Sequence, residues 1–191
     1  MKRVWLTRLL GVISICMLLS TSLLAARDAI VLKEFAVYPS EEPKVLVANL
    51  RFDYELSSYL RESLLNGVTL RSEVRFDLVW YSEWWFDRRE PLTSIVTELK
   101  YHALSGQYQL IQKNSGNSWN FSSLTAALEY LGDVGRFQLP PLPKKAYSNE
   151  AALFTEAILE PESPDSPLNL SYLFSDKHRL VSQGVLWTIQ P

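Results

Sequence analysis

Two carboxylates flank a pair of tryptophans in the segment VWYSEWWFD, which covers residues 79–87. Glu83 and Asp87 could act as general acid and general base on a glycan, because most glycoside hydrolases use two carboxylates in these roles. Acidic residues number 21 in a chain of 191, so such a pair is weak evidence on its own. An envelope glycan hydrolase is therefore the weakest of three functional hypotheses that the sequence supports.

Other patterns that carry catalysis or hold a metal do not occur in the sequence. There is no HExxH, HxH, GxSxG or glycine-rich phosphate loop, and Cys16 is the only cysteine. His102 stands beside a predicted hairpin, where we expect a structural or surface role, and His178 stands in the polar stretch SDKHR, where we expect it to be solvated. We predict no catalytic residue, no metal site and no cofactor, although folding could still bring a serine, a histidine and a carboxylate together.

The aromatic segment divides into two faces if it is a strand, because side chains of a strand alternate in direction. The even positions from 74 to 86 are apolar except Ser82, so Trp80, Trp84 and Phe86 are predicted to lie in the core. The odd positions begin charged and become aromatic toward the end. Tyr81 and Trp85 are therefore the candidates for exposure, unless a helix or loop covers Trp85.

The exposed half of this segment, followed by two arginines, is the predicted binding site. Tyr81 and Trp85 could contact a glycan, a lipid headgroup or a partner protein, because their rings combine apolar area with a polar tip. Arg88 and Arg89 follow directly and could meet an anionic membrane surface. The alternative is that the two arginines form a solvated turn.

The first residues have the layout of a bacterial secretory signal peptide. Three basic residues precede an apolar run over 9–24, which ends in Ala25-Ala26 before charged residues. We expect cleavage after Ala26 and export to the periplasm. The alternative is an uncleaved inner-membrane anchor over residues 9–26, although 16 apolar residues are few for a span, which usually needs about 20. Cys16 lies inside this run after the bulky Ile15, which argues against lipid attachment there.

Charge and length limit the class of protein. Three of the 19 basic residues lie within residues 1–26 and all 21 acidic residues follow, so the remaining chain has a net charge of 16 − 21 = −5. Nucleic-acid binding needs a basic surface that neutralises phosphates, so we predict no nucleic-acid partner. Residues 27–191 have the length of one domain.

The local patterns predict an α+β fold. It consists of a curved, mainly antiparallel β-sheet of about seven or eight strands with two short helices covering part of it. Helices are predicted over 55–65, ended by Asn66-Gly67, and over 122–131, begun by Ser122 or Ser123 and ended by Gly132. Residues 114–120 read as a polar loop and 138–145 as an extended proline-rich segment. Strands are predicted over 29–38, 44–54, 68–86, 92–103 and 107–113, whereas 149–160 suits a helix or a strand. The chain closes with LVSQGVLWTIQP, a predicted strand in which Val181, Val185, Trp187 and Ile189 share one face.

Several stretches in a fixed order resemble an uncharacterised proteobacterial envelope family, domain of unknown function 4390. They are LLNGVTLRSEV, WYSEWWFD, LKYHALSGQYQL, FSSLTAALEYLG and VSQGVLW. The family pattern has an aspartate after the apolar run near Leu159, where this chain has Glu160-Pro161. The resemblance favours a strand over residues 151–159. It implies an envelope location and, for some members, a gene neighbourhood with an NtrY/NtrX-type sensor kinase and regulator, and it carries over no catalytic residue.

The leading hypothesis is a non-enzymatic periplasmic interaction module that binds an envelope or inner-membrane protein. The second is a carrier of an apolar ligand such as a lipid, because the predicted inward face is rich in aromatic residues. The sequence gives no basis for predicting the oligomeric state.

Overall fold

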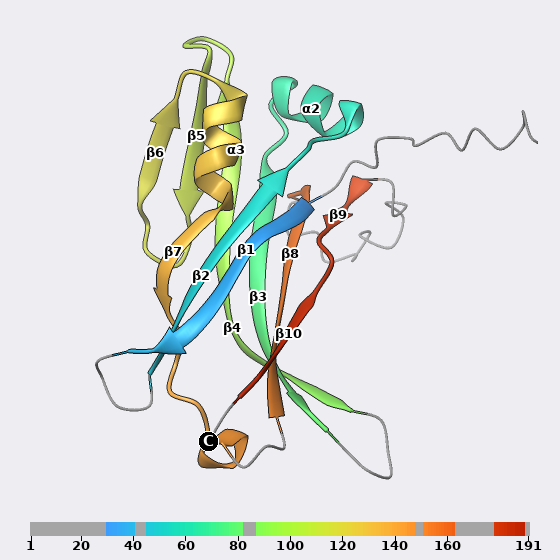
Figure 1. Cartoon of the computed structure of the whole chain (residues 1–191). Helices are drawn as coiled ribbons and strands as arrows, with labels where there is room; N and C mark the ends of the chain where they lie inside the picture. The colour runs from blue at the N-terminus through green and yellow to red at the C-terminus, as the bar shows by residue number, and fades with distance from the viewer. Residues whose placement is uncertain (1–29, 41–44, 82–86, 148–150, 163–177, 190–191) are drawn as a thin grey trace, which may run out of the picture.

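The computed structural model describes residues 30–40, 45–81, 87–147, 151–162 and 178–189. Within these residues the chain forms two antiparallel sheets, two α-helices and one short 3₁₀ helix (Figure 1). The small sheet has the strand order β1-β2-β7, and the large sheet has the order β10-β8-β3-β4-β5-β6, with β9 also paired to β8.

Every strand pair is antiparallel, and the longest pairings join β3 to β4 and β8. In the small sheet the strands are β1 (Ile30–Pro39), β2 (Leu46–Tyr54) and β7 (Asp133–Gln138). In the large sheet they are β3 (Leu70–Trp80), β4 (Arg88–His102), β5 (Gln107–Gln112), β6 (Ser118–Phe121), β8 (Ala151–Pro161), β9 (Leu180–Val181) and β10 (Val185–Thr188). The helices are α2 (Ser58–Leu65), α3 (Leu124–Gly132) and the 3₁₀ helix η1 (Lys144–Tyr147).

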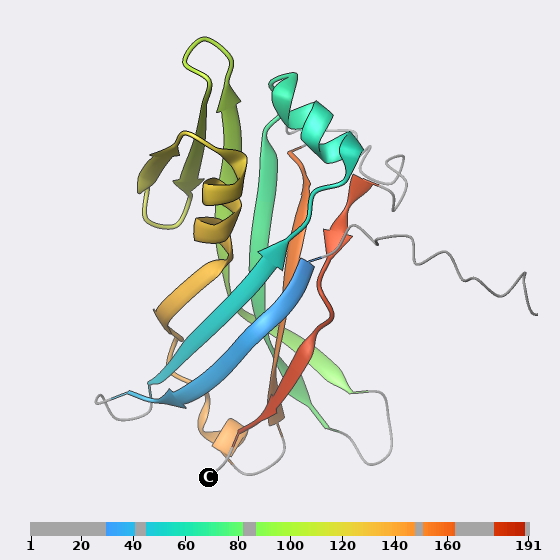
Figure 2. The same ribbon diagram turned by 45° about the horizontal axis from the view of Figure 1, so that its top comes forward.

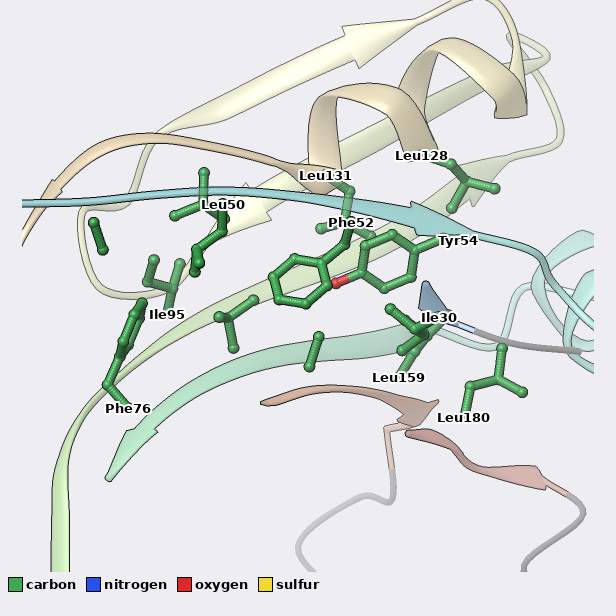
Figure 3. Close-up of a cluster of buried hydrophobic side chains, with 14 of the residues drawn as sticks. Ile30, Leu50, Phe52, Tyr54, Phe76, Ile95, Leu128, Leu131, Leu159 and Leu180 are labelled. Carbon is green, nitrogen blue, oxygen red and sulfur yellow. The ribbon is translucent and has the colours of Figure 1, made fainter. Parts of the chain in front are cut away.

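The small sheet crosses one face of the large sheet, and the core lies between them (Figures 1 and 2). Phe76 of β3 stacks on Phe137 of β7 with ring centroids 5.3 Å apart. The hydroxyl groups of Tyr54 and Ser72 share a buried hydrogen bond of 3.0 Å, and burial raises the pKa of Tyr54 to about 12. Figure 3 shows Tyr54 among the apolar side chains of this core.

Helix α3 completes the core beside the small sheet. Its Tyr130 ring lies 5.0 Å from Trp119 and 5.3 Å from Phe121, both on β6. Its start follows the sequence signal, because the Ser123 hydroxyl accepts a hydrogen bond from the Ala126 amide at 3.2 Å. Helix α3 thus covers the inner face of β5 and β6, which the small sheet leaves open (Figure 2).

The predicted fold class is confirmed: an α+β, mainly antiparallel structure with two short helices. Residues 151–161 form a strand, as the resemblance favours. The end of α2 is also as predicted, with Gly67 at a φ of 88°, which glycine adopts without strain.

The number and placement of short strands differ from the prediction. Ten strands form among the described residues, in two sheets rather than one. Strand β6 lies within the predicted polar loop 114–120 and just beyond it, and β7 has no counterpart in the sequence analysis. The β2–β7 pairing is irregular and Arg136 has a φ of 52°, so β7 lacks the regular alternation by which strands are recognised. The proline-rich segment also ends in η1 rather than continuing extended.

The strand predicted for the closing stretch LVSQGVLWTIQP is two strands, β9 and β10, with a break between them. Ser182 fills the break: its hydroxyl accepts a hydrogen bond from the Ala157 amide at 2.8 Å. The break changes which positions face inward, so Leu180 is buried whereas Val181 is exposed. The prediction that Val181 shares a face with Val185 and Trp187 is therefore wrong.

The predicted signal peptide, residues 1–26, lies outside the described residues. No helix in the part of the chain that the structure describes is long and apolar enough to span a membrane.

Candidate functional site

The predicted site lies where β3 ends and β4 begins. Along β3, Leu70, Val74, Phe76 and Leu78 are buried, and Trp80 is half-buried against the core, so the predicted inward face of this strand is confirmed. Trp84, Phe86, Trp85 and Glu83 lie outside the described residues.

Tyr81, Arg88 and Arg89 lie at this end of the hairpin and are exposed, and we call these three residues the hairpin end. Tyr81 follows β3 with 49% of its surface exposed, in agreement with the alternation. Arg88 and Arg89 open β4 and pair in register with Trp80 and Val79. A ring and two guanidinium groups are thus available at one end of the large sheet.

Arg88 belongs to a polar chain that reaches the core tryptophan. Its Nη2 lies 2.8 Å from Glu90 Oε1, and Trp80 Nε1 donates a hydrogen bond to Glu90 Oε2 at 2.8 Å. Glu90 therefore fixes the Trp80 indole and holds Arg88 beside it.

Arg89 lies on the opposite face of the hairpin. Its guanidinium carbon is 3.8 Å from the ring centroid of Phe154, which is a close cation–π contact. The same guanidinium lies 4.0 Å from Asp77 Oδ2 and 4.0 Å from Glu156 Oε1. The two arginines therefore do not form one patch, because neighbouring residues of a strand point to opposite faces.

Arg89 is the end of a row of charges along β3 and β8. Arg71 and Arg75 both contact Glu73, at 3.0 and 3.2 Å. Burial raises the pKa of Glu73, but the Arg75 hydrogen bond and the charge of Arg71 outweigh it, and the net shift is downward. Burial raises the pKa of Asp77, and the nearby Arg89 only partly offsets that increase. The row continues from Glu73 through Arg71 to Glu160 of β8, which lies 3.3 Å from Arg179, the residue before β9.

Glu98 on β4 is a carboxylate with only 1% of its surface exposed. Its Oε2 lies 2.8 Å from Lys100 Nζ, and its Oε1 contacts Lys113 Nζ. Burial opposes ionisation, but the two lysines and Glu162 outweigh it and lower the pKa of Glu98 to about 2. Burial and the neighbouring Glu98 raise the pKa of Glu162. Glu98 is thus charged and Glu162 holds a proton more readily than an ordinary glutamate.

The two histidines lie apart from the hairpin end and from each other. His102 is exposed, and its Nε2 shares a 2.9 Å hydrogen bond with Gln109 Oε1, in line with a surface role. His178 differs from the prediction: it is half-buried, and its ring packs against Tyr59 of α2 with centroids 3.9 Å apart and the ring planes tilted by 36°. Among the described residues, no three histidine, cysteine, aspartate or glutamate side chains form a group that could hold a metal.

Sequence reasoning missed the charge row and the burial of Glu98. The alternating signs of Arg71, Glu73, Arg75 and Asp77 were a visible signal, because these residues share one face of β3. Nothing local marks Glu98, since one of the two lysines that contact its carboxylate, Lys113, follows the neighbouring strand β5.

The family model for a domain of unknown function, DUF4390, matches residues 27–188. The chain therefore belongs to this family. No curated protein and no solved structure matches it.

Proposed function

We propose that this protein is a non-enzymatic periplasmic interaction module that binds an envelope or inner-membrane protein through the hairpin end. The observation that carries the proposal is the exposure of Tyr81 at the same end of the hairpin as two exposed arginines, which lie on opposite faces of it. Exposed aromatic and arginine side chains are the types that contribute most to protein interfaces. The periplasmic location is supported by the signal-peptide layout of residues 1–26, and the family match begins at residue 27.

The partner we propose is a membrane protein of an NtrY/NtrX-type signalling system. Support comes from the gene neighbourhood that the family resemblance implies. A periplasmic module beside a sensor kinase would contact the part of the kinase that is exposed on the same side of the membrane. The hairpin end would then modulate signalling by binding, without chemistry of its own.

Photo-crosslinking in cells tests this contact. With a photoreactive amino acid at position 81, we expect a crosslink to a membrane protein of the signalling system, identified by mass spectrometry. Trp85→Ala in the same chain should reduce the crosslink about tenfold or more, since tryptophan is enriched among the hot-spot residues whose loss costs about 2 kcal/mol or more in binding.

The matched control places the photoreactive group at position 31. Val31 is exposed on β1 of the small sheet, and we expect no specific crosslink there. Equal capture by the parent and Trp85→Ala, or equal capture from positions 31 and 81, would show that the hairpin end is not the binding site.

The carrier hypothesis requires space for an apolar ligand between the two sheets. Core side chains occupy part of that space, as the contact of Phe76 with Phe137 shows. We expect native mass spectrometry of the protein isolated from cells to give the mass of the polypeptide alone. A co-purifying lipid mass would instead favour the carrier.

The hydrolase hypothesis stays the weakest of the three. It would gain support if the protein hydrolysed cell-wall glycan and Glu83→Gln abolished that activity.

A further inference from the structure

The face of the large sheet turned away from the small sheet carries most of the ion pairs found in the described residues. We call it the outer face. Strand register places Arg71, Glu73, Arg75 and Asp77 on it, because the side chains between them point into the core. Asp77 and Glu156 pair with Arg89, and Glu160 pairs with both Arg71 and Arg179. Glu98, the register partner of Arg71, pairs with Lys100 and Lys113.

In these ion pairs the carboxylates are buried more deeply than the cations, and we call this arrangement the layering of the face. The side chains of Glu98, Asp77, Glu73 and Glu156 are 1, 10, 13 and 18% exposed. The six cations of the same face, which lie above these carboxylates, are 34–53% exposed. Glu160, at the β9 end, is the exception at 35%. The outermost groups of this face are therefore mainly guanidinium and ammonium groups.

Side-chain length alone does not produce this layering. The small sheet has two comparable pairs, Lys33 with Asp53 and Arg51 with Glu34. There the carboxylates are the more exposed partners, at 66 and 69% against 52 and 60% for the cations. The small sheet thus has the reverse order of charges, whereas the Arg88–Glu90 pair of β4 has the same order as the outer face, at 70 and 43% exposed.

We propose that the outer face docks a protein partner that presents carboxylates. The proposal rests on the interaction role proposed above and names the chemistry of the partner. A guanidinium group has five N–H donors, and an arginine that already contacts one carboxylate keeps donors for a second. Arg75 and Arg89 can therefore bind a partner's carboxylates while their own carboxylates hold them in place.

The same layering disfavours an anionic membrane as the partner. Attraction to a charged membrane depends on net positive charge near the surface. Here each cation lies within 4.0 Å of a carboxylate, and the whole chain has a net charge of −2. The electric fields of the paired charges therefore largely cancel at a distance. A partner must instead contact the face directly, with acceptor groups positioned to meet the N–H donors of the arginines and lysines.

The size of the array suits a protein surface. Arg71 and Val79, the register partner of Arg89, are eight residues apart on β3. At a rise of about 3.3 Å per residue the array is roughly 26 Å long. Arg89 belongs to both this array and the hairpin end, so one partner can cover both.

A labelled deca-glutamate peptide is the probe for the test, with the protein purified as cells produce it. We expect the peptide to bind at low ionic strength and a deca-lysine peptide not to bind. Arg75→Gln combined with Arg89→Gln should weaken deca-glutamate binding at least tenfold. Lys33→Gln combined with Arg51→Gln removes the same charge from the small sheet and should leave binding unchanged.

Thermal unfolding of each variant shows whether the fold is kept. If the first pair fails to fold, Arg71→Gln with Arg179→Gln replaces it, because their shared partner Glu160 is the most exposed carboxylate of the face. Absence of deca-glutamate binding, or equal loss in the small-sheet control, would overturn the proposal. Binding of phosphatidylglycerol vesicles with the same dependence on Arg75 and Arg89, without peptide binding, would assign the face to the membrane instead. Failure of the crosslink at position 81 does not affect these outcomes, so the two proposals fail separately.

Discussion

Gly132→Ala is expected to lower the free energy of unfolding by about 3 kcal/mol, at the upper end of the usual cost of overpacking a core. A Cβ atom at this position would lie 2.0 Å from the carbonyl oxygen of Phe52 and 3.0 Å from its carbonyl carbon. Both atoms belong to the backbone of β2, so relief requires a shift of the strand or of α3. Helix propensity alone would make the substitution stabilising by about 1 kcal/mol, so the sign of the change is diagnostic.

Urea unfolding of the parent and the variant measures this difference. Gly135→Ala is the matched control, because the nearest atom to its added Cβ is Asp133 Oδ1 at 3.8 Å, an ordinary contact. We expect that control to stay within about 0.5 kcal/mol of the parent, as substitutions without a steric conflict usually do. If Gly132→Ala is as stable as the parent, α3 does not approach β2 this closely.

Gly132 also shows where sequence reasoning reaches its limit. A glycine after an apolar helical stripe predicts a helix end, and α3 does end there. The reason that glycine is needed is the approach to Phe52, which lies 80 positions earlier in the chain. A local sequence pattern does not extend over 80 residues, so the close approach of Gly132 to Phe52 is seen only in the folded structure.

The β3 strand is the part of the fold that the sequence predicts best. Alternation identifies its inward residues, such as Phe76, because a period of two is a local property of the chain. The same alternation separates Arg88 from Arg89, although the sequence analysis grouped them by their proximity. Arg88 meets Glu90 of its own strand, whereas the carboxylates that Arg89 meets, Asp77 and Glu156, depend on the partner strands β3 and β8. Pairing between distant strands is not encoded in either segment alone.

The candidate site was predicted only in part for the same reason. The exposure of Tyr81 agrees with the alternation, whereas its role in binding stays a prediction. The outer face was not foreseen, because the burial of each charged side chain depends on neighbours from three strands, β3, β4 and β8, and from the residues next to β5 and β9. Glu98 is the extreme case: the local sequence ELK is typical of an exposed strand, yet the carboxylate is buried.

Glu98→Gln is expected to remove an acid-dependent part of the stability. The pKa of Glu98 is about 2 in the folded protein, against 4.5 for an unperturbed glutamate. A carboxylate with a lowered folded-state pKa stabilises the fold above its unfolded pKa, and this contribution is lost as the pH falls from about 4.5 to 2. A shift of this size corresponds to roughly 3 kcal/mol as an upper figure.

Glu162 acts in the opposite direction. Its pKa is raised in the folded protein, so it favours the fold at low pH, and its contribution is lost as the pH rises through the folded pKa. Glu162→Gln should therefore make the free energy of unfolding depend less on pH above pH 4.5. The loss of stability between pH 4.5 and 2, which comes from Glu98, should remain. The two variants separate the contributions of two carboxyl groups that lie close together.

At neutral pH we expect Glu98→Gln to cost about 2 kcal/mol, less than the 3–5 kcal/mol typical of a broken buried ion pair. The difference arises because Lys100 and Lys113 are 34 and 53% exposed and can turn toward water once their partner is neutral. Urea unfolding at pH values from 2 to 7 gives both the neutral cost and the acid-dependent part. Glu34→Gln is the control, because Glu34 forms an exposed pair with Arg51 on the small sheet. If the stability curves of the parent and Glu98→Gln stay parallel below pH 4.5, the two lysines do not hold this carboxylate in its charged form.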